Sequence, residues 1–119
     1  MRIIIQSIPH KDQRYPTCGD WYQDASGWWR IQVSELGDWR FEALVAFHEL
    51  VEMLLCQADG VDAAEVDRFD LAFEDDTEPG DDLSAPYYEQ HQRACGYERL
   101  LAADLDVDWL EYERTIEAL

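Results

Sequence analysis

Residues 41–56, FEALVAFHELVEMLLC, decide how this chain folds. The segment is apolar almost all the way round, which predicts a buried helix. Within it His48 and Glu52 are four residues apart, and residues with this spacing share one face of a helix. A second carboxylate, Glu49, adjoins the imidazole. Because buried charged groups need pairing, hydrogen bonds or a metal ion, the pattern predicts either a metal site or an internal ion pair.

The segments around this helix predict a single α+β domain spanning residues 1–119. Residues 2–8 read as a strand, and residues 21–34 read as a hairpin. Apolar and polar side chains alternate in residues 28–34, which is typical of a half-buried strand at a sheet edge. Helices are expected at residues 39–57, 62–75, 85–103 and 108–118. We therefore expect a small antiparallel sheet, made of the N-terminal strand and the hairpin, followed by about four helices on one face.

Composition indicates a soluble globular protein. Of the 119 residues 47% are apolar and 30% are charged, and no apolar run approaches the length of a membrane span. The three cysteines are odd in number and form no C-x-x-C pair, so neither a disulfide framework nor a zinc ribbon is expected. A cytoplasmic location with reduced thiols is the simplest interpretation.

The charge of the chain is strongly negative and unevenly distributed. The formal net charge is −18, of which residues 58–119 carry −15. Such a surface repels nucleic acid and anionic membranes, so neither is expected as a partner. It could attract basic proteins or divalent cations.

The string H-E-x-x-E at residues 48–52 follows a strand and a short turn and has apolar flanks. Residues 29–34 and 46–50 together resemble the zincin metallopeptidases, in particular the small type that cleaves phage repressors. The resemblance implies that His48 is a zinc ligand, that Glu49 is the general base and that Glu52 stands at the second ligand position. The family has histidine there. A carboxylate adds negative charge, so manganese, iron and magnesium are alternatives to zinc.

A catalytic zinc needs a third protein ligand. His91 is the first candidate, because it is one of three histidines and lies on a downstream helix, where zincins often keep that ligand. Asp70 is the second candidate, because it lies at the edge of an apolar stripe, and Glu74 is a weaker one. Cys95 and Glu98 follow His91 on one helix face, as groups behind the ligands or as core residues.

The whole chain also resembles an uncharacterised family of phage and prophage proteins. That resemblance implies a viral or prophage origin, and the host cytoplasm as the location. The segments that carry it are Thr17–Trp21, His48–Glu52, Asp67–Asp70, Glu78–Asp82 and Ala85–Tyr87 with His91.

Two functions are expected from different classes. The first is a metal-dependent hydrolase, with Glu49 activating water and the strand at residues 28–34 holding a peptide or protein substrate by adding a strand. The second is a non-catalytic acidic protein that binds a basic host protein or mimics the charge of nucleic acid. Without a metal, His48 and Glu52 would form an internal hydrogen-bonded pair, and His91 would close the network. The oligomeric state does not follow from the sequence.

Overall fold

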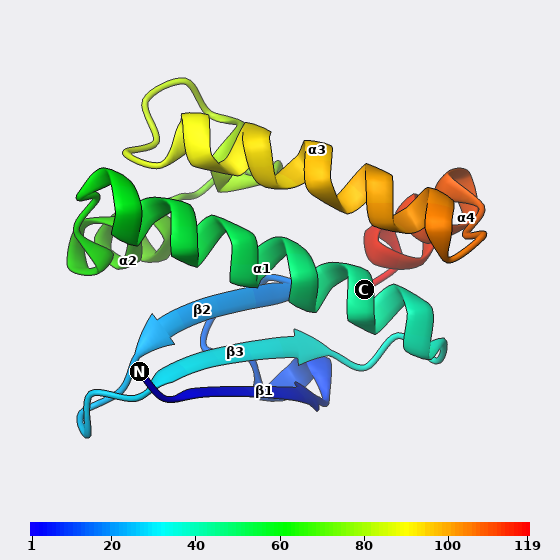
Figure 1. The fold of residues 1–119 in the computed structure, drawn as a ribbon, viewed down its shortest axis with the longest axis horizontal. Coiled ribbons are helices and arrows are strands. Elements are labelled where there is room, and N and C mark those ends of the chain that lie inside the picture. Colours follow the sequence, from blue (N-terminus) through cyan, green and yellow to red (C-terminus); the bar gives the residue numbers. More distant parts are fainter.

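Three strands and four helices make up the computed structural model, which describes residues 1–119. The strands are β1 (Ile3–Ile8), β2 (Gly19–Gln23) and β3 (Trp29–Ser34). The helices are α1 (Trp39–Asp59), α2 (Ala63–Ala72), α3 (Tyr88–Asp104) and α4 (Trp109–Glu117), with short 3-10 turns η1 (His10–Asp12) and η2 (Pro79–Asp81). The helices cover one face of the sheet (Figure 1), so the α+β class predicted from the sequence is confirmed.

The sheet is mixed, and in this respect the expectation of an antiparallel sheet was wrong. The strand order is β1-β3-β2. β3 is antiparallel to β2 across the hairpin, but it is parallel to β1. β3 is therefore the central strand, although its sequence was expected at an edge, because alternation reports which side chains are buried and not how many neighbours pair. Since both sides of β3 are already paired, it cannot accept a peptide as a further strand.

α1 is apolar on nearly all sides because it is covered on two sides. The sheet lies below it and α3 lies above it (Figure 1). The helix begins where the side chain of Asp38 accepts a hydrogen bond from the backbone of Arg40, and it ends at Gly60, whose φ of 72° is in the left-handed region. Its predicted extent, residues 39–57, is two residues shorter at the C-terminal end.

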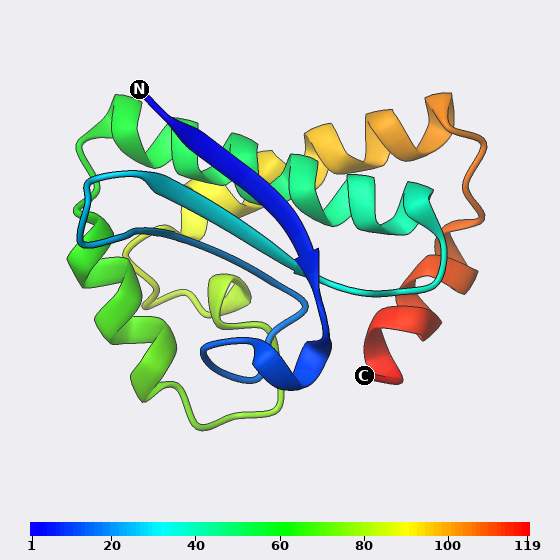
Figure 2. The same ribbon diagram turned by 90° about the horizontal axis from the view of Figure 1, so that it is seen from below.

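α1 and α3 are antiparallel neighbours. Arg40, near the start of α1, donates to the carbonyl of Leu105 just past the end of α3, at 3.4 Å. Gln90, near the start of α3, donates to Asp59 at the end of α1, at 2.9 Å. α2 and α4 lie at opposite ends of the sheet (Figure 2). This pairing brings the middle of α1, with its polar residues, against the first half of α3.

The hydrophobic core lies between the sheet and α1, and it extends to α3 and α4. Its buried members include Ile31 and Val33 of β3, Leu44 and Met53 of α1, and Tyr112 of α4. None of the helices combines the length and the apolar character that crossing a membrane requires.

Candidate metal centre

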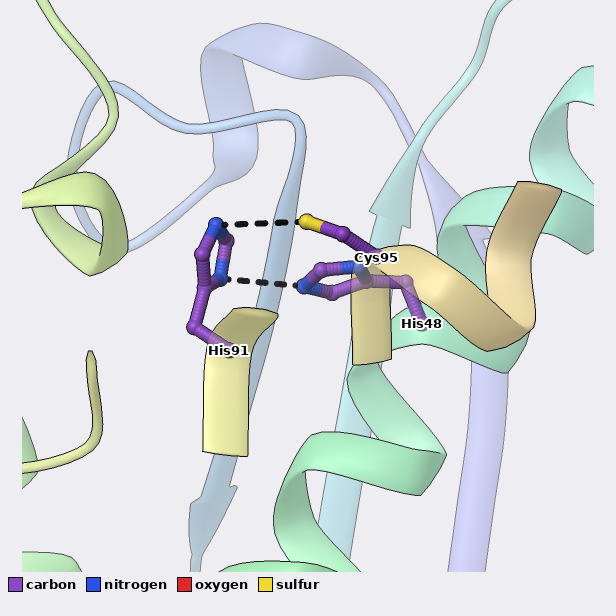
Figure 3. Close-up of side chains that lie close together, drawn as sticks. All are labelled: His48, His91 and Cys95. Carbon is purple, nitrogen blue, oxygen red and sulfur yellow. Dashed lines mark hydrogen bonds between the residues drawn. The ribbon is translucent and has the colours of Figure 1, made fainter. Parts of the chain in front are cut away.

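Three of the predicted site residues meet between the two central helices. His48 and Glu52 lie one turn apart on α1, and His91 faces them from α3. Their exposed fractions are only 7%, 4% and 5%. Figure 3 shows the imidazoles of His48 and His91 turned toward each other, with Cys95 beside them. The spacing of His48 and Glu52 in the sequence predicted that these two side chains share one face of a buried helix, and the structure brings His91 to them from α3.

One atom of each of these residues points to a common centre. His48 Nε2 lies 3.1 Å from Glu52 Oε2 and 3.2 Å from His91 Nδ1. His91 Nδ1 lies 2.8 Å from the same Glu52 oxygen. Ligands about 2.0–2.1 Å from a tetrahedral ion are about 3.3 Å from one another, so the three atoms have nearly the spacing of one face of such a site.

The outward-facing atoms of all three side chains are also held. His48 Nδ1 lies 2.7 Å from Glu98 Oε1, and Trp21 Nε1 donates to Glu52 Oε1 at 2.8 Å. His91 Nε2 lies 3.2 Å from Asp81 Oδ1. Metal ligands are commonly oriented by such hydrogen bonds from behind, because the bond fixes the tautomer and the direction of the ring.

Cys95 belongs to the same group of side chains. His48, His91 and Cys95 each offer a ligand atom within 4.8 Å of the others, a spacing that is compatible with a divalent ion. The sulfur lies 3.6 Å from His91 Nε2 (Figure 3), whereas His91 Nδ1 faces His48 and Glu52. The two nitrogens of one imidazole point in different directions. Glu52 is therefore the residue that contacts both His48 Nε2 and His91 Nδ1. Cys95 instead contacts His91 Nε2.

Burial and hydrogen bonding shift the pKa values of the three side chains of this network. Burial favours the uncharged form of Glu52, but the hydrogen bonds from His48 and His91 outweigh it and lower its pKa to about 2. Burial opposes the charged forms of both imidazoles, yet the contacts with Cys95 and Glu52 raise the pKa of His91 to about 11. The pKa of His48 is raised in the same way. Without a metal ion, both imidazoles therefore favour their protonated forms.

A pocket of about 200 Å³ opens beside the imidazoles. Glu49 lines it next to His48, and the half-buried carboxylate makes no hydrogen bond with another residue. A methyl group on Gly19 would lie 2.9 Å from the Glu49 side chain, so the absence of a side chain at Gly19 is what makes room for it. Burial and the nearby charge of Glu52 raise the pKa of Glu49 well above its usual value. Glu49 thus faces the pocket without a hydrogen-bond partner in the protein.

The other sequence candidates lie outside this group. Asp70 accepts hydrogen bonds from the hydroxyls of Tyr15 and Tyr87, which satisfy both of its oxygens, so it is not brought to the imidazoles. Glu74 is exposed in the loop that follows α2. The third histidine, His10, is half-buried away from the centre, and its Nδ1 lies 2.8 Å from Ser34 Oγ.

Several residues that hold the centre were not singled out as site residues in the sequence. Trp21 contacts Glu52 directly, and Asp81 contacts His91 directly. A methyl group on Gly80 would lie 2.5 Å from the His91 ring, so the loop at η2 packs directly on that imidazole. Nothing in the sequence connected either of these two regions, Thr17–Trp21 and Glu78–Asp82, to His48.

The centre therefore consists of two imidazoles and one carboxylate, oriented from behind and open to a small pocket. No protein-family model, curated protein or solved structure matches the chain.

Proposed function

We propose that this protein is a metal-dependent hydrolase whose ion is bound by His48, Glu52 and His91. The observation that carries the proposal is the triangle formed by His48 Nε2, His91 Nδ1 and Glu52 Oε2, with sides of 2.8, 3.1 and 3.2 Å. The contact between the two nitrogens can be bridged by one proton at most, whereas an ion can bind all three atoms at once.

The set of donor atoms supports zinc. Two histidines and one glutamate form the ligand set of several zinc peptidases. The zincin motif has histidine where this chain has Glu52, but here His91 supplies the second imidazole. The ligand set of two histidines and one glutamate, and its total charge, are therefore the same. Only the positions of the second histidine and the glutamate are exchanged. The same donors also suit iron and manganese, whereas magnesium prefers oxygen ligands. Zinc is therefore our first proposal for the ion.

Glu49 fits the role of general base. It follows the ligand His48 directly, lines the pocket and has no hydrogen-bond partner in the protein. A bound zinc ion polarises a carbonyl group and lowers the pKa of water. Glu49 would take the proton of the attacking water and return it to the departing amine or alcohol. An amide or ester is thus the proposed substrate class, with a peptide as the first choice.

The test compares hydrolysis of a mixed library of fluorogenic peptides by the zinc-loaded protein and by its E49Q variant. We expect E49Q to bind zinc like the wild type but to lose at least about 100-fold in turnover, as expected for loss of a general base. E111Q, an exposed glutamate on α4 outside the pocket, removes the same charge and should leave turnover unchanged. Equal turnover by E49Q, or no hydrolysis by the zinc-loaded wild type, would refute the proposed activity.

The alternative, a non-catalytic acidic protein that binds a basic host protein or mimics nucleic acid, rests on the net charge of −15 in residues 58–119. Two measurements distinguish this alternative from the hydrolase: the salt dependence of binding and the effect of E49Q. Association through charge weakens steeply as salt rises, and it would not depend on Glu49.

A further inference from the structure

α4 reaches the proposed metal centre through a chain of two hydrogen bonds. The hydroxyl of Tyr112 donates to Glu98 Oε2 at 2.7 Å. The other oxygen of this carboxylate, Oε1, lies 2.7 Å from His48 Nδ1. The last helix of the chain is thereby connected to a ligand residue on α1, through one side chain of α3.

The three side chains of this hydrogen-bonded chain are largely buried and tightly packed. Tyr112 is 1% exposed, and the side chains of His48 and Glu98 are 9% and 12% exposed. The tyrosine ring packs between two aromatic residues, with centroid distances of 5.4 Å to Phe41 and 5.2 Å to Trp109. Hydrogen bonds are stronger where water is excluded, so the hydroxyl fixes the orientation of the Glu98 carboxylate and, through it, of the His48 ring.

Tyr112 also anchors α4 in the core. It is the one buried residue of that helix. The connection to α3 turns at Asp106, whose φ of 55° is in the left-handed region that residues other than glycine rarely adopt. Arg40 donates to the carbonyls of Leu105 and Asp106 there. Trp109 and Ile116 also pack against the core as partly buried residues, but Tyr112 is the residue of α4 that is fully enclosed and reaches Glu98.

We infer that Tyr112 is a positioning residue of the metal centre, and that docking of α4 and binding of the ion are coupled through Glu98. The inference rests on the proposed function, because it concerns the same site. A carboxylate behind a ligand histidine directs its other nitrogen to the ion, and the tyrosine holds that carboxylate. Coupling between two binding events is reciprocal. If docking of α4 raises the affinity for the ion by a certain factor, the ion raises the docking equilibrium of α4 by the same factor.

The first experiment measures zinc affinity by competition with a chelator in the wild type and in Y112F, which keeps the aromatic packing and removes only the hydroxyl. We expect Y112F to bind zinc about 10-fold more weakly, at the lower end of the effect of residues behind metal ligands. Zinc should slow hydrogen exchange of the α4 amides in the wild type, and this protection should be reduced by the same factor in Y112F. Y97F, at an exposed tyrosine of α3 with no side-chain hydrogen bond, is the matched control and should change neither quantity.

A second variant separates positioning from a general loss of structure. E98Q removes the carboxylate that connects Tyr112 with His48. We expect Y112F to cause no further loss of zinc affinity in the E98Q background, because the effects of residues in one hydrogen-bond network are not additive. The absorption spectrum of the Co²⁺-substituted protein should change in Y112F and not in Y97F. Wild-type affinity and an unchanged cobalt spectrum in Y112F would overturn the inference and leave the proposed function intact. Absence of zinc and cobalt binding in the wild type would overturn both.

Discussion

His48 Nε2 lies 3.2 Å from His91 Nδ1, although 43 positions separate the two residues in the chain. Each nitrogen also lies within 3.1 Å of the same oxygen of Glu52. Antiparallel packing of α1 and α3 produces this contact, and the groups behind each side chain maintain it.

Replacing either imidazole should remove the ion. We expect H48A and H91A each to weaken zinc binding by at least about 100-fold, because a site with two protein ligands no longer resembles a catalytic zinc site. H10A, which removes the third histidine of the chain, should bind one zinc ion per chain like the wild type. Metal content after dialysis checks this, and retention of zinc by both H48A and H91A would contradict it.

Trp21 should contribute to the metal site without touching the ion. W21F keeps an aromatic ring in the core but removes the N–H that donates to Glu52 Oε1 at 2.8 Å. We expect zinc affinity to fall about 10-fold, as found when a group that orients a ligand is removed. W29F is the matched control, because Trp29 packs beside Trp21 and makes no side-chain hydrogen bond. Titration with zinc should separate the two variants.

Gly80 and Gly96 should respond in opposite directions to the same substitution. A methyl group at Gly80 would lie 2.5 Å from the ring of His91, so G80A should displace the imidazole, weaken zinc binding and destabilise the fold by about 1–3 kcal/mol. Gly96 lies within α3 and has nothing within 4 Å of a methyl group. G96A should therefore stabilise the protein by about 0.5–1 kcal/mol. Denaturant unfolding measures both, and similar behaviour of the two variants would count against the packing of η2 on His91.

Asp70 should affect stability rather than metal binding. Burial raises its pKa to about 7, in spite of the hydrogen bonds from Tyr87 and Tyr15 that lower it. The folded protein therefore holds this proton more tightly than the unfolded chain, and the stabilisation is lost as the pH rises from about 4 to about 7. D70N should show a smaller decline of unfolding free energy over this range and an unchanged zinc affinity. A large loss of zinc affinity in D70N would instead restore Asp70 as a candidate ligand.

The sequence predicted the parts of the structure that depend on local patterns. The spacing of His48 and Glu52, with the apolar residues around them, was sufficient to place both inside a helix and on one face. His91 was found because histidine is rare in this chain and it falls on a later helix. The direction of β1 and the central position of β3 were not predicted, because strand pairing is decided by contacts between distant segments.

The groups that hold the centre from behind were largely beyond the reach of sequence patterns. Asp81 and Trp21 lie in an acidic loop and in a strand, and neither segment has a spacing that connects it to His48. Asp70 had the burial expected of a ligand, but two tyrosines from other segments satisfy it. A candidate ligand in a sequence can thus be assigned only when its partners in space are known.

The most direct measurement of the central claim is anomalous diffraction at the zinc absorption edge from crystals of the zinc-loaded protein. One peak per chain is predicted, at about 2.0–2.2 Å from His48 Nε2, His91 Nδ1 and Glu52 Oε2. A peak elsewhere on the molecule, or no peak while these three atoms keep their mutual contacts of 2.8–3.2 Å, would contradict the account and identify the group as an internal hydrogen-bond network.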